Sequence, residues 1–323
     1  MSGRDLRIVF MGTPEFAAHS LRDMHSKGYN VVAAVTVPDK PAGRGLKVHQ
    51  SDVKQFATSV GIPVLQPEKL RDEAFISELE TLNADLFVVV AFRMLPEVVW
   101  AMPKLGTFNL HASLLPKYRG AAPINWAIIN GETKTGVTTF MLNHNIDEGD
   151  MLFQREVEIL HEDTIGTLYE KLMYVGADLI TETVDALAEG RATRHVQSEE
   201  GACPAPKIFR EDCVINWNQD VSKVYNFVRG LSPYPAASSQ LPLAARGENI
   251  NVKLYSVKME VNPHANDFVC GTLLTNMRTE IKIACNDGFL IIEELQVAGK
   301  KRLRTKEFLL GFKCEGNEKI EIL

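Results

Sequence analysis

Asn109 and His111 are the two residues of this chain whose types and spacing most directly suggest chemistry. They follow a mostly apolar run at residues 87–91, which predicts a buried parallel strand. Residues 107–110 predict a second short strand. If that strand continues through His111, both side chains point to the same face of the sheet. An amide and an imidazole on one face can hold a carbonyl oxygen and pass protons.

Asp147, in a later predicted loop, could orient the His111 imidazole and favour its charged form. No Ser or Cys stands beside a base in a nucleophile-elbow pattern, so a covalent acyl-enzyme is not expected. The three residues instead suit direct attack by a substrate amine on a bound acyl donor, with Asn109 and His111 stabilising the oxyanion. An isolated Asn-x-His pair is most often structural, so this prediction depends on the surrounding sequence.

The surrounding sequence is far more specific than the pair alone. Residues 109–123 read NLHASLLPKYRGAAP, and they are followed by Gly136-Val137-Thr138 and Asp147-Glu148-Gly149-Asp150. This combination resembles the folate-dependent formyltransferase family. The resemblance implies that Asn109, His111 and Asp147 are catalytic. It also implies a 10-formyltetrahydrofolate site lined by Ser113, Leu114, Leu115 and Pro116.

The chain departs from the family pattern at two places. Phe92-Arg93 stands where family members commonly have Tyr-Gly, and Ala112 stands where Gly is common. Both places should border the folate pocket. Ala112 adds a single methyl group, which is tolerated if that position does not need a positive φ.

Composition is ordinary for a globular protein, with 45% hydrophobic and 24% charged residues among 323. No apolar run approaches the roughly 20 residues of a membrane span, and the N-terminus lacks the apolar core of a secretory signal. A cytoplasmic location is the expectation. The five cysteines are odd in number and none are spaced Cys-x-x-Cys, which argues against a disulfide framework or a zinc knuckle, and no metal is expected.

The first part of the chain predicts an α/β domain. A strand at residues 7–11, a helix at 16–24 and a valine-rich strand at 31–37 form a Rossmann-like beginning to a parallel-rich sheet. The turn between them lacks Gly-x-Gly-x-x-Gly, so a dinucleotide cofactor is disfavoured. A further helix is predicted at residues 68–82, and the catalytic domain is predicted to span residues 1–190.

The remainder of the chain predicts a linker and a second domain. Residues 191–208 have little periodicity and contain two prolines, as expected of an interdomain linker. Residues 209–323 contain a short helix and several short strands with glycine turns, which favours a small β-barrel. The family resemblance implies an OB-like barrel that binds tRNA.

Two basic segments bear on the substrate. The loop at residues 38–47 resembles one that family members acting on methionyl-tRNA insert into the catalytic domain, which implies that Arg44 contacts the acceptor end of the tRNA. Residues 299–306 hold five cations, including Lys300, Lys301, Arg302 and Arg304, and Lys207 could also touch RNA. The net charge of −6 gives no global basic signature, although residues 209–323 carry 15 Lys+Arg against 14 Asp+Glu.

Taken together, these features predict transfer of the formyl group of 10-formyltetrahydrofolate to the α-amine of initiator methionyl-tRNA, by a monomer. Formylation of an amino-sugar nucleotide is the nearest alternative, but it leaves the Arg44 loop without a use, and related sugar enzymes tend to carry Arg where this chain has Ala121. A purine-pathway formyltransferase would not need residues 209–323. A formyltetrahydrofolate hydrolase would be expected to carry an earlier regulatory domain. A non-catalytic RNA-binding module would leave the three candidate catalytic residues unexplained.

Overall fold

The computed structural model describes residues 2–42, 47–243, 248–311 and 318–319. The chain divides into two compact units. Unit 1 comprises residues 1–123, 135–158 and 169–205, and unit 2 comprises residues 124–134, 159–168 and 206–323. Two short segments that precede residue 169 therefore belong to the same unit as residues 206–323. The boundaries expected from sequence, at residues 190 and 209, remain predictions.

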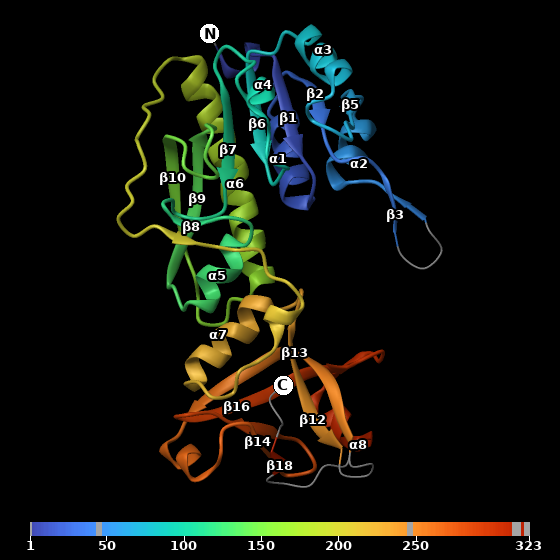
Figure 1. Ribbon diagram of the computed structural model, residues 1–323, viewed down its shortest axis with the longest axis vertical. Coiled ribbons are helices and arrows are strands. Elements are labelled where there is room, and N and C mark those ends of the chain that lie inside the picture. Colours follow the sequence, from blue (N-terminus) through green and yellow to red (C-terminus); the bar gives the residue numbers. More distant parts are fainter. Residues whose placement is uncertain (1, 43–46, 244–247, 312–317, 320–323) are drawn as a thin grey trace. The chain divides into compact units, whose positions relative to one another are not determined.

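Unit 1 is built on a seven-stranded sheet in the order β10-β9-β7-β6-β1-β2-β5 (Figure 1). The β1, β2, β5, β6 and β7 strands pair in parallel, and β9 pairs with β7 in the antiparallel direction. The strands are β1 (Ile8–Gly12), β2 (Val31–Val35), β5 (Val64–Leu65), β6 (Leu86–Val90), β7 (Thr107–His111), β9 (Lys134–Met141) and β10 (Met151–Glu158). The expected Rossmann-like, parallel-rich sheet is confirmed.

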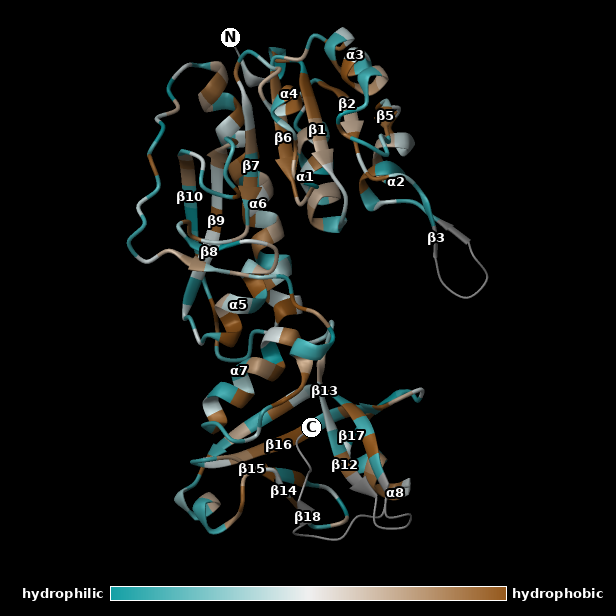
Figure 2. Ribbon diagram, viewed as in Figure 1, coloured by the Kyte–Doolittle hydropathy of each residue, from teal (hydrophilic) through white to brown (hydrophobic). Residues whose placement is uncertain are grey.

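Helices cover both faces of this sheet, which explains why its central strands are almost wholly apolar (Figure 2). On one face, Phe75 and Leu79 of α3 and Val99 of α4 join a buried cluster with alternate residues of β1, β2 and β6. On the other face, α1 and α6 meet where Phe16 packs edge-on against Tyr169. The helices are α1 (Glu15–Ser26), α2 (Asp52–Ser59), α3 (Glu73–Thr81), α4 (Glu97–Trp100) and α6 (Ile165–Ala188).

The helix predicted at residues 68–82 is shorter than expected. The α3 helix begins at Glu73 because Asp72 caps it: the Asp72 carboxylate accepts hydrogen bonds from the backbone N–H groups of Ala74 and Phe75, each 3.1 Å long. The preceding residues form a loop, and the arginine after β6, Arg93, donates to the carbonyl oxygens of Pro67 and Glu68 in that loop.

Two short pairings complete unit 1. Strands β3 (Lys40–Ala42) and β4 (Lys47–His49) form an antiparallel hairpin, which projects from the body of the unit in Figure 1. Strand β8 (Lys117–Arg119) pairs in parallel with β11 (Cys203–Pro204). The second pairing shows that part of the predicted linker is a fixed structural element of unit 1.

Unit 2 contains a seven-stranded antiparallel sheet in the order β12-β13-β16-β15-β14-β18, with β17 added to β16. This antiparallel sheet forms a half-barrel, and Trp217 lies fully buried in its core. The strands are β12 (Ala237–Leu243), β13 (Glu248–Val261), β14 (Thr272–Thr275), β15 (Ile281–Ala284), β16 (Gly288–Val297), β17 (Arg302–Arg304) and β18 (Glu318–Lys319). The helices are α5 (Pro123–Ile129), α7 (Val221–Leu231) and α8 (Thr305–Gly311). Among the described helices, none is both long and apolar enough to cross a membrane.

Candidate active site

Strand β7 carries Asn109 and His111 near its carboxyl end, with β6 on one side and β9 on the other. The pairing of β7 with β9 extends to His111, which lies opposite Thr138. Since side chains alternate along a strand, Asn109 and His111 share the face on which Thr107 donates to the carbonyl oxygen of Trp100 in α4. Leu110 points the other way, toward Gly176 of α6. The expected placement of the pair on one face is therefore observed.

His111 is buried, and one edge of its imidazole is fixed by backbone. Its Nε2 lies 2.8 Å from the carbonyl oxygen of Tyr118, so this nitrogen carries the proton and donates it. Its Nδ1 lies 3.8 Å from Oδ2 of Asp147, which is longer than a hydrogen bond. The Nδ1 atom therefore remains available to a substrate that enters beside the carboxylate.

Asp147 occupies a strained position in the loop between β9 and β10. Its φ of +56° lies in the left-handed region, which non-glycine residues rarely adopt. Its Oδ2 accepts a 2.9 Å hydrogen bond from the backbone N–H of Gly120. Gly149 anchors the other end of the loop, where a Cβ would stand 1.6 Å from the carbonyl oxygen of Met141. The loop thus aims the carboxylate at the imidazole.

Asn109 contributes the one buried side-chain oxygen of this group that has no hydrogen-bond partner within the described part of the chain. Leaving such an atom unpaired costs about 1–3 kcal/mol, so it calls for a partner. A half-turn of the side-chain amide would exchange this oxygen for an N–H donor. The site therefore has an amide ready to bind a polar group of a substrate.

Residues 113–116 form a loop that is held from inside. Ser113 donates to the carbonyl oxygen of Lys117 over 2.6 Å, and the Thr138 hydroxyl bridges the carbonyl oxygen of Ser113 and the N–H of Leu115. Ser113 and Leu115 are buried, whereas Leu114 and Pro116 are only half-buried. Of the four residues predicted to line a folate site, only Leu114 and Pro116 have side chains that are partly exposed to solvent.

Four groups near the three predicted residues were not anticipated from sequence. Two are backbone groups, the Tyr118 carbonyl oxygen and the Gly120 N–H, which a pattern of side chains in the sequence cannot predict. The others are side chains. Arg119 donates to Gln197, and Gln197 donates to the carbonyl oxygens of Asp147 and Gly149. Gln197 lies in the predicted linker, where no periodicity marked it.

The basic residues predicted to bind tRNA fall into three places. Lys300, Lys301, Arg302 and Arg304 lie together and exposed on the β16–β17 hairpin of unit 2. Arg302 is already engaged, since it pairs with Glu294 and its guanidinium lies 4.3 Å from the Tyr255 ring centre. Lys207 comes from a separate segment of unit 2 and lies over the Phe209 ring. Arg44 falls outside the described residues.

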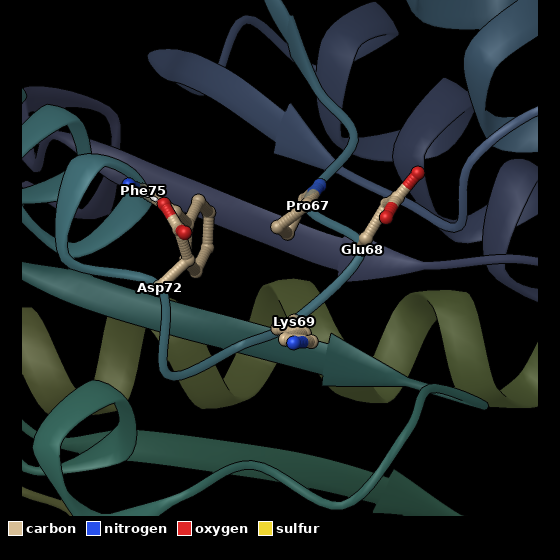
Figure 3. Close-up of a pocket in the computed structure, with 5 residues that line it drawn as sticks. All are labelled: Pro67, Glu68, Lys69, Asp72 and Phe75. Atoms are coloured by element: carbon tan, nitrogen blue, oxygen red, sulfur yellow. Dashed lines mark hydrogen bonds between the residues drawn. The ribbon is translucent and has the colours of Figure 1, made fainter.

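A pocket of about 340 Å³ lies elsewhere in unit 1, lined by Pro67, Glu68, Lys69, Asp72 and Phe75 (Figure 3). The pocket borders the loop whose carbonyl oxygens accept hydrogen bonds from Arg93. Burial lowers the pKa of the Arg93 guanidinium. None of the predicted site residues lines the pocket. Within the described ranges, no group of three or more His, Cys, Asp and Glu side chains is arranged to hold a metal ion.

Comparison with known proteins places this chain in a family. Residues 6–184 match the model described as formyl transferase, and residues 207–313 match the model of the formyl transferase C-terminal domain. The chain belongs to the formyl transferase family. The sequence resemblance that carried the prediction is thereby confirmed.

Similar formyl transferases extend over nearly the whole chain. The methionyl-tRNA formyltransferase of Parabacteroides distasonis is 55% identical over 319 residues, which cover 97% of this chain and 98% of that protein. The methionyl-tRNA formyltransferase of Bacteroides fragilis is 52% identical, with 97% of each chain covered.

Solved structures share the fold at much lower identity. HypX from Aquifex aeolicus in complex with tetrahydrofolic acid aligns with a TM-score of 0.63 at 18% identity, covering 94% of this chain and 47% of that one. WlaRD, a sugar 3N-formyl transferase, aligns with a TM-score of 0.64 at 20% identity, covering 92% and 99% of the two chains. At this identity the likeness supports the formyl transferase fold alone.

Proposed function

We propose that the protein transfers the formyl group of 10-formyltetrahydrofolate to the α-amino group of initiator methionyl-tRNA. The observation that carries the proposal is the likeness to proteins named methionyl-tRNA formyltransferase, which share about half of their residues with this chain along 97–98% of their length. That likeness extends through unit 2, which carries the exposed cations of the β16–β17 hairpin.

Asn109 and His111 would bind the formyl oxygen as it gains negative charge. Asn109 offers its side-chain amide, whose oxygen has no partner among the described residues, and His111 offers Nδ1–H once that nitrogen has taken a proton from the attacking amine. His111 is buried and Asn109 is half-buried, and hydrogen bonds to a developing oxyanion are stronger in such surroundings than in water. Preorganised donors of this kind typically contribute a factor of about 100 to 1,000 each to the rate.

Proton transfer would also pass through His111. The attacking amine must lose a proton and the departing N10 nitrogen of the folate must gain one. His111 Nδ1, with the Asp147 carboxylate 3.8 Å away, is placed to move that proton. The carboxylate would lie beside the imidazole while the ring holds that proton. Because the amine attacks the formyl carbon directly, no covalent enzyme intermediate forms.

The two substrates would use different surfaces. The folate would lie along the loop at residues 113–116, where Leu114 and Pro116 keep accessible surface and Ser113 and Leu115 hold the backbone in place. The tRNA backbone would contact the exposed cations Lys300, Lys301 and Arg304, together with Lys207, Arg302 and Arg44. Holding both substrates in register would supply much of the acceleration.

The proposal is tested by a formyl-transfer assay with 10-formyltetrahydrofolate and three acceptors: charged initiator methionyl-tRNA, the same tRNA uncharged, and a UDP-amino sugar. Formylation of the charged tRNA alone is expected. Formylation of the sugar would overturn the proposal that methionyl-tRNA is the acceptor, but it would leave the proposed roles of Asn109, His111 and Asp147 unchanged. The predicted monomeric state and cytoplasmic location stay predictions, and light scattering on the purified protein would test the first.

A further inference from the structure

Residues 193–201 show an inverted pattern of burial. Val196 is 83% exposed, whereas its polar neighbour Gln197 is 9% exposed and is the only buried residue in this described stretch. Burying an amide while exposing a valine is unfavourable unless the amide makes hydrogen bonds that repay its desolvation. The inversion therefore points to a specific task for Gln197.

The segment is fixed on both sides of Gln197. On one side, His195 and Met151 exchange two backbone hydrogen bonds of 2.8 and 2.9 Å at the start of β10. On the other side, Cys203 and Pro204 form β11 and pair with β8. The segment thus crosses the loops that carry Asp147 and Gly120, and all of these residues belong to unit 1.

The side-chain amide of Gln197 has both of its ends occupied. Its Nε2 donates to the carbonyl oxygens of Asp147 and Gly149, each over 2.8 Å. Its Oε1 accepts from Nε and Nη2 of Arg119, each over 3.1 Å. Arg119 has no acceptor atom and a carbonyl oxygen has no donor, so these partners allow only one orientation of the amide.

The hydrogen bonds from Gln197 act on the loop that carries Asp147. Asp147 has a left-handed backbone, which residues with a side chain rarely adopt. Its neighbours at residues 143–146 are exposed, so the loop has little packing of its own. The two hydrogen bonds from Gln197 hold the carbonyl groups of Asp147 and Gly149, the residues on either side of Glu148, and so fix the direction in which the Asp147 carboxylate points.

We infer that Gln197 is a positioning residue for Asp147, with Arg119 fixing the orientation of its amide. This inference rests on the proposed catalytic role of Asp147. Gln197 does not touch the reacting atoms. It supplies the geometry in which the carboxylate lies against His111, and a displacement of about 1 Å at such a site can cost 100-fold in rate.

Two variants test the inference. Gln197→Leu keeps the volume and removes every hydrogen bond. Gln197→Glu keeps an oxygen for Arg119 but removes the N–H donors to Asp147 and Gly149. We expect both to lower kcat by roughly 30- to 100-fold, with the KM of each substrate changed less than threefold. A glutamate variant that retains full kcat would overturn the inference, because the donors would then be unnecessary.

A matched control lies two residues away. Glu199 also contacts Arg119, over 3.2 Å, but its side chain is 80% exposed. Glu199→Gln should keep kcat within about twofold, since an exposed ion pair contributes little. If this control loses as much activity as the Gln197 variants, the effect comes from general disturbance of Arg119 and the inference fails.

A double-mutant cycle separates positioning from a purely structural role. If Gln197 acts through Asp147, then Gln197→Leu should reduce kcat by less than threefold in a protein that already carries Asp147→Asn. Multiplication of the two single losses would overturn the inference. The ratio of variant to wild-type kcat can be measured with whichever amine the wild type formylates, so failure of the proposed acceptor leaves this test intact. Should Gln197→Leu fail to fold, the cycle is run with Gln197→Glu.

Discussion

The carbonyl oxygen of Tyr118 lies 2.8 Å from Nε2 of His111 and accepts a hydrogen bond from it. This bond leaves Nδ1 as the imidazole nitrogen that can contact a substrate. Tyr118 itself has a φ of +62°, so backbone in an unfavourable conformation provides this contact. The consequence is that Nδ1, on the side of Asp147, is the atom that can exchange a proton with a substrate.

Replacement of His111 by alanine should abolish turnover. Both the oxyanion contact and the proton carrier are lost, and a general acid–base group alone typically contributes a factor of about 100 to 10,000. Binding of the tRNA should remain nearly intact because its proposed contacts are elsewhere. Single-turnover formyl transfer and a filter-binding assay would measure the two properties.

His144→Ala provides the control for that experiment, because His144 is exposed and pairs with Glu97. It should behave like the wild type. Near-normal turnover of the His111 variant would remove His111 from the mechanism.

Replacement of Thr138 by valine should raise the KM for 10-formyltetrahydrofolate several-fold. The hydroxyl holds the carbonyl oxygen of Ser113 and the N–H of Leu115, so its loss frees the loop proposed to bind the folate. Leaving these buried groups unpaired should also cost about 1–3 kcal/mol of stability. Steady-state kinetics and urea unfolding would measure the two effects.

Thr139→Val is the matched control. Thr139 lies next on the same strand and its hydroxyl pairs with that of Thr183 on α6, over 2.9 Å. This variant should lose comparable stability and keep its folate KM. An equal rise of KM in both variants would show that Thr138 acts only through stability.

Replacement of Lys300 and Lys301 by alanine should raise the KM for methionyl-tRNA and leave the folate KM unchanged. Removal of each lysine that contacts a phosphate should lower the slope of log KM against log salt by about one. The assay is steady-state kinetics over a range of salt concentrations. Lys258→Ala, an exposed lysine of unit 2 that pairs with Glu293, is the control and should leave the slope unchanged.

Arg302→Ala should weaken tRNA binding less than either lysine replacement. Its guanidinium pairs with Glu294 and lies over the Tyr255 ring, so part of its binding capacity is already used. The same tRNA assay measures this difference. A larger loss than that of the lysine variants would mean that Arg302 exchanges Glu294 for a phosphate.

The ion pair between Lys282 and Glu260 should make the stability of unit 2 depend on pH. The hydrogen bond from Lys282 lowers the pKa of Glu260, and the bond to Glu260 raises the pKa of Lys282. A lowered carboxyl pKa gives stability that is present above about pH 4.3, the unfolded value, and is lost as the pH falls through the folded value. A raised lysine pKa gives stability that is present below about pH 10.4 and is lost above the folded value.

Lys282→Met should therefore destabilise the protein by about 0.5 kcal/mol at pH 7, and this cost should shrink as the pH falls below about 4. Urea unfolding followed by tryptophan fluorescence at several pH values would measure it. A cost that stays constant as the pH falls would show that Lys282 acts through its Nζ contact with the Phe289 ring and not through Glu260.

The sequence was sufficient to predict the sheet of unit 1 and the common face of Asn109 and His111, because strand alternation and apolar runs are local properties. It could not predict contacts made by backbone atoms, such as the Tyr118 carbonyl oxygen and the Gly120 N–H. It also missed Gln197, because an isolated polar residue in an aperiodic stretch looks the same whether it is solvated or buried. Those contacts depend on how distant segments meet, which only the fold determines.

Asp147 and Gln197 are 50 residues apart in the chain. At a synthesis rate of about 5–20 residues per second, the ribosome would deliver Gln197 roughly 3 to 10 seconds after Asp147. During that interval the Asp147 carboxylate would lack the two hydrogen bonds from Gln197 that we infer position it. The proposed site, with Gln197 bonded to the Asp147 loop, can therefore be complete only after nearly two thirds of the protein has been made.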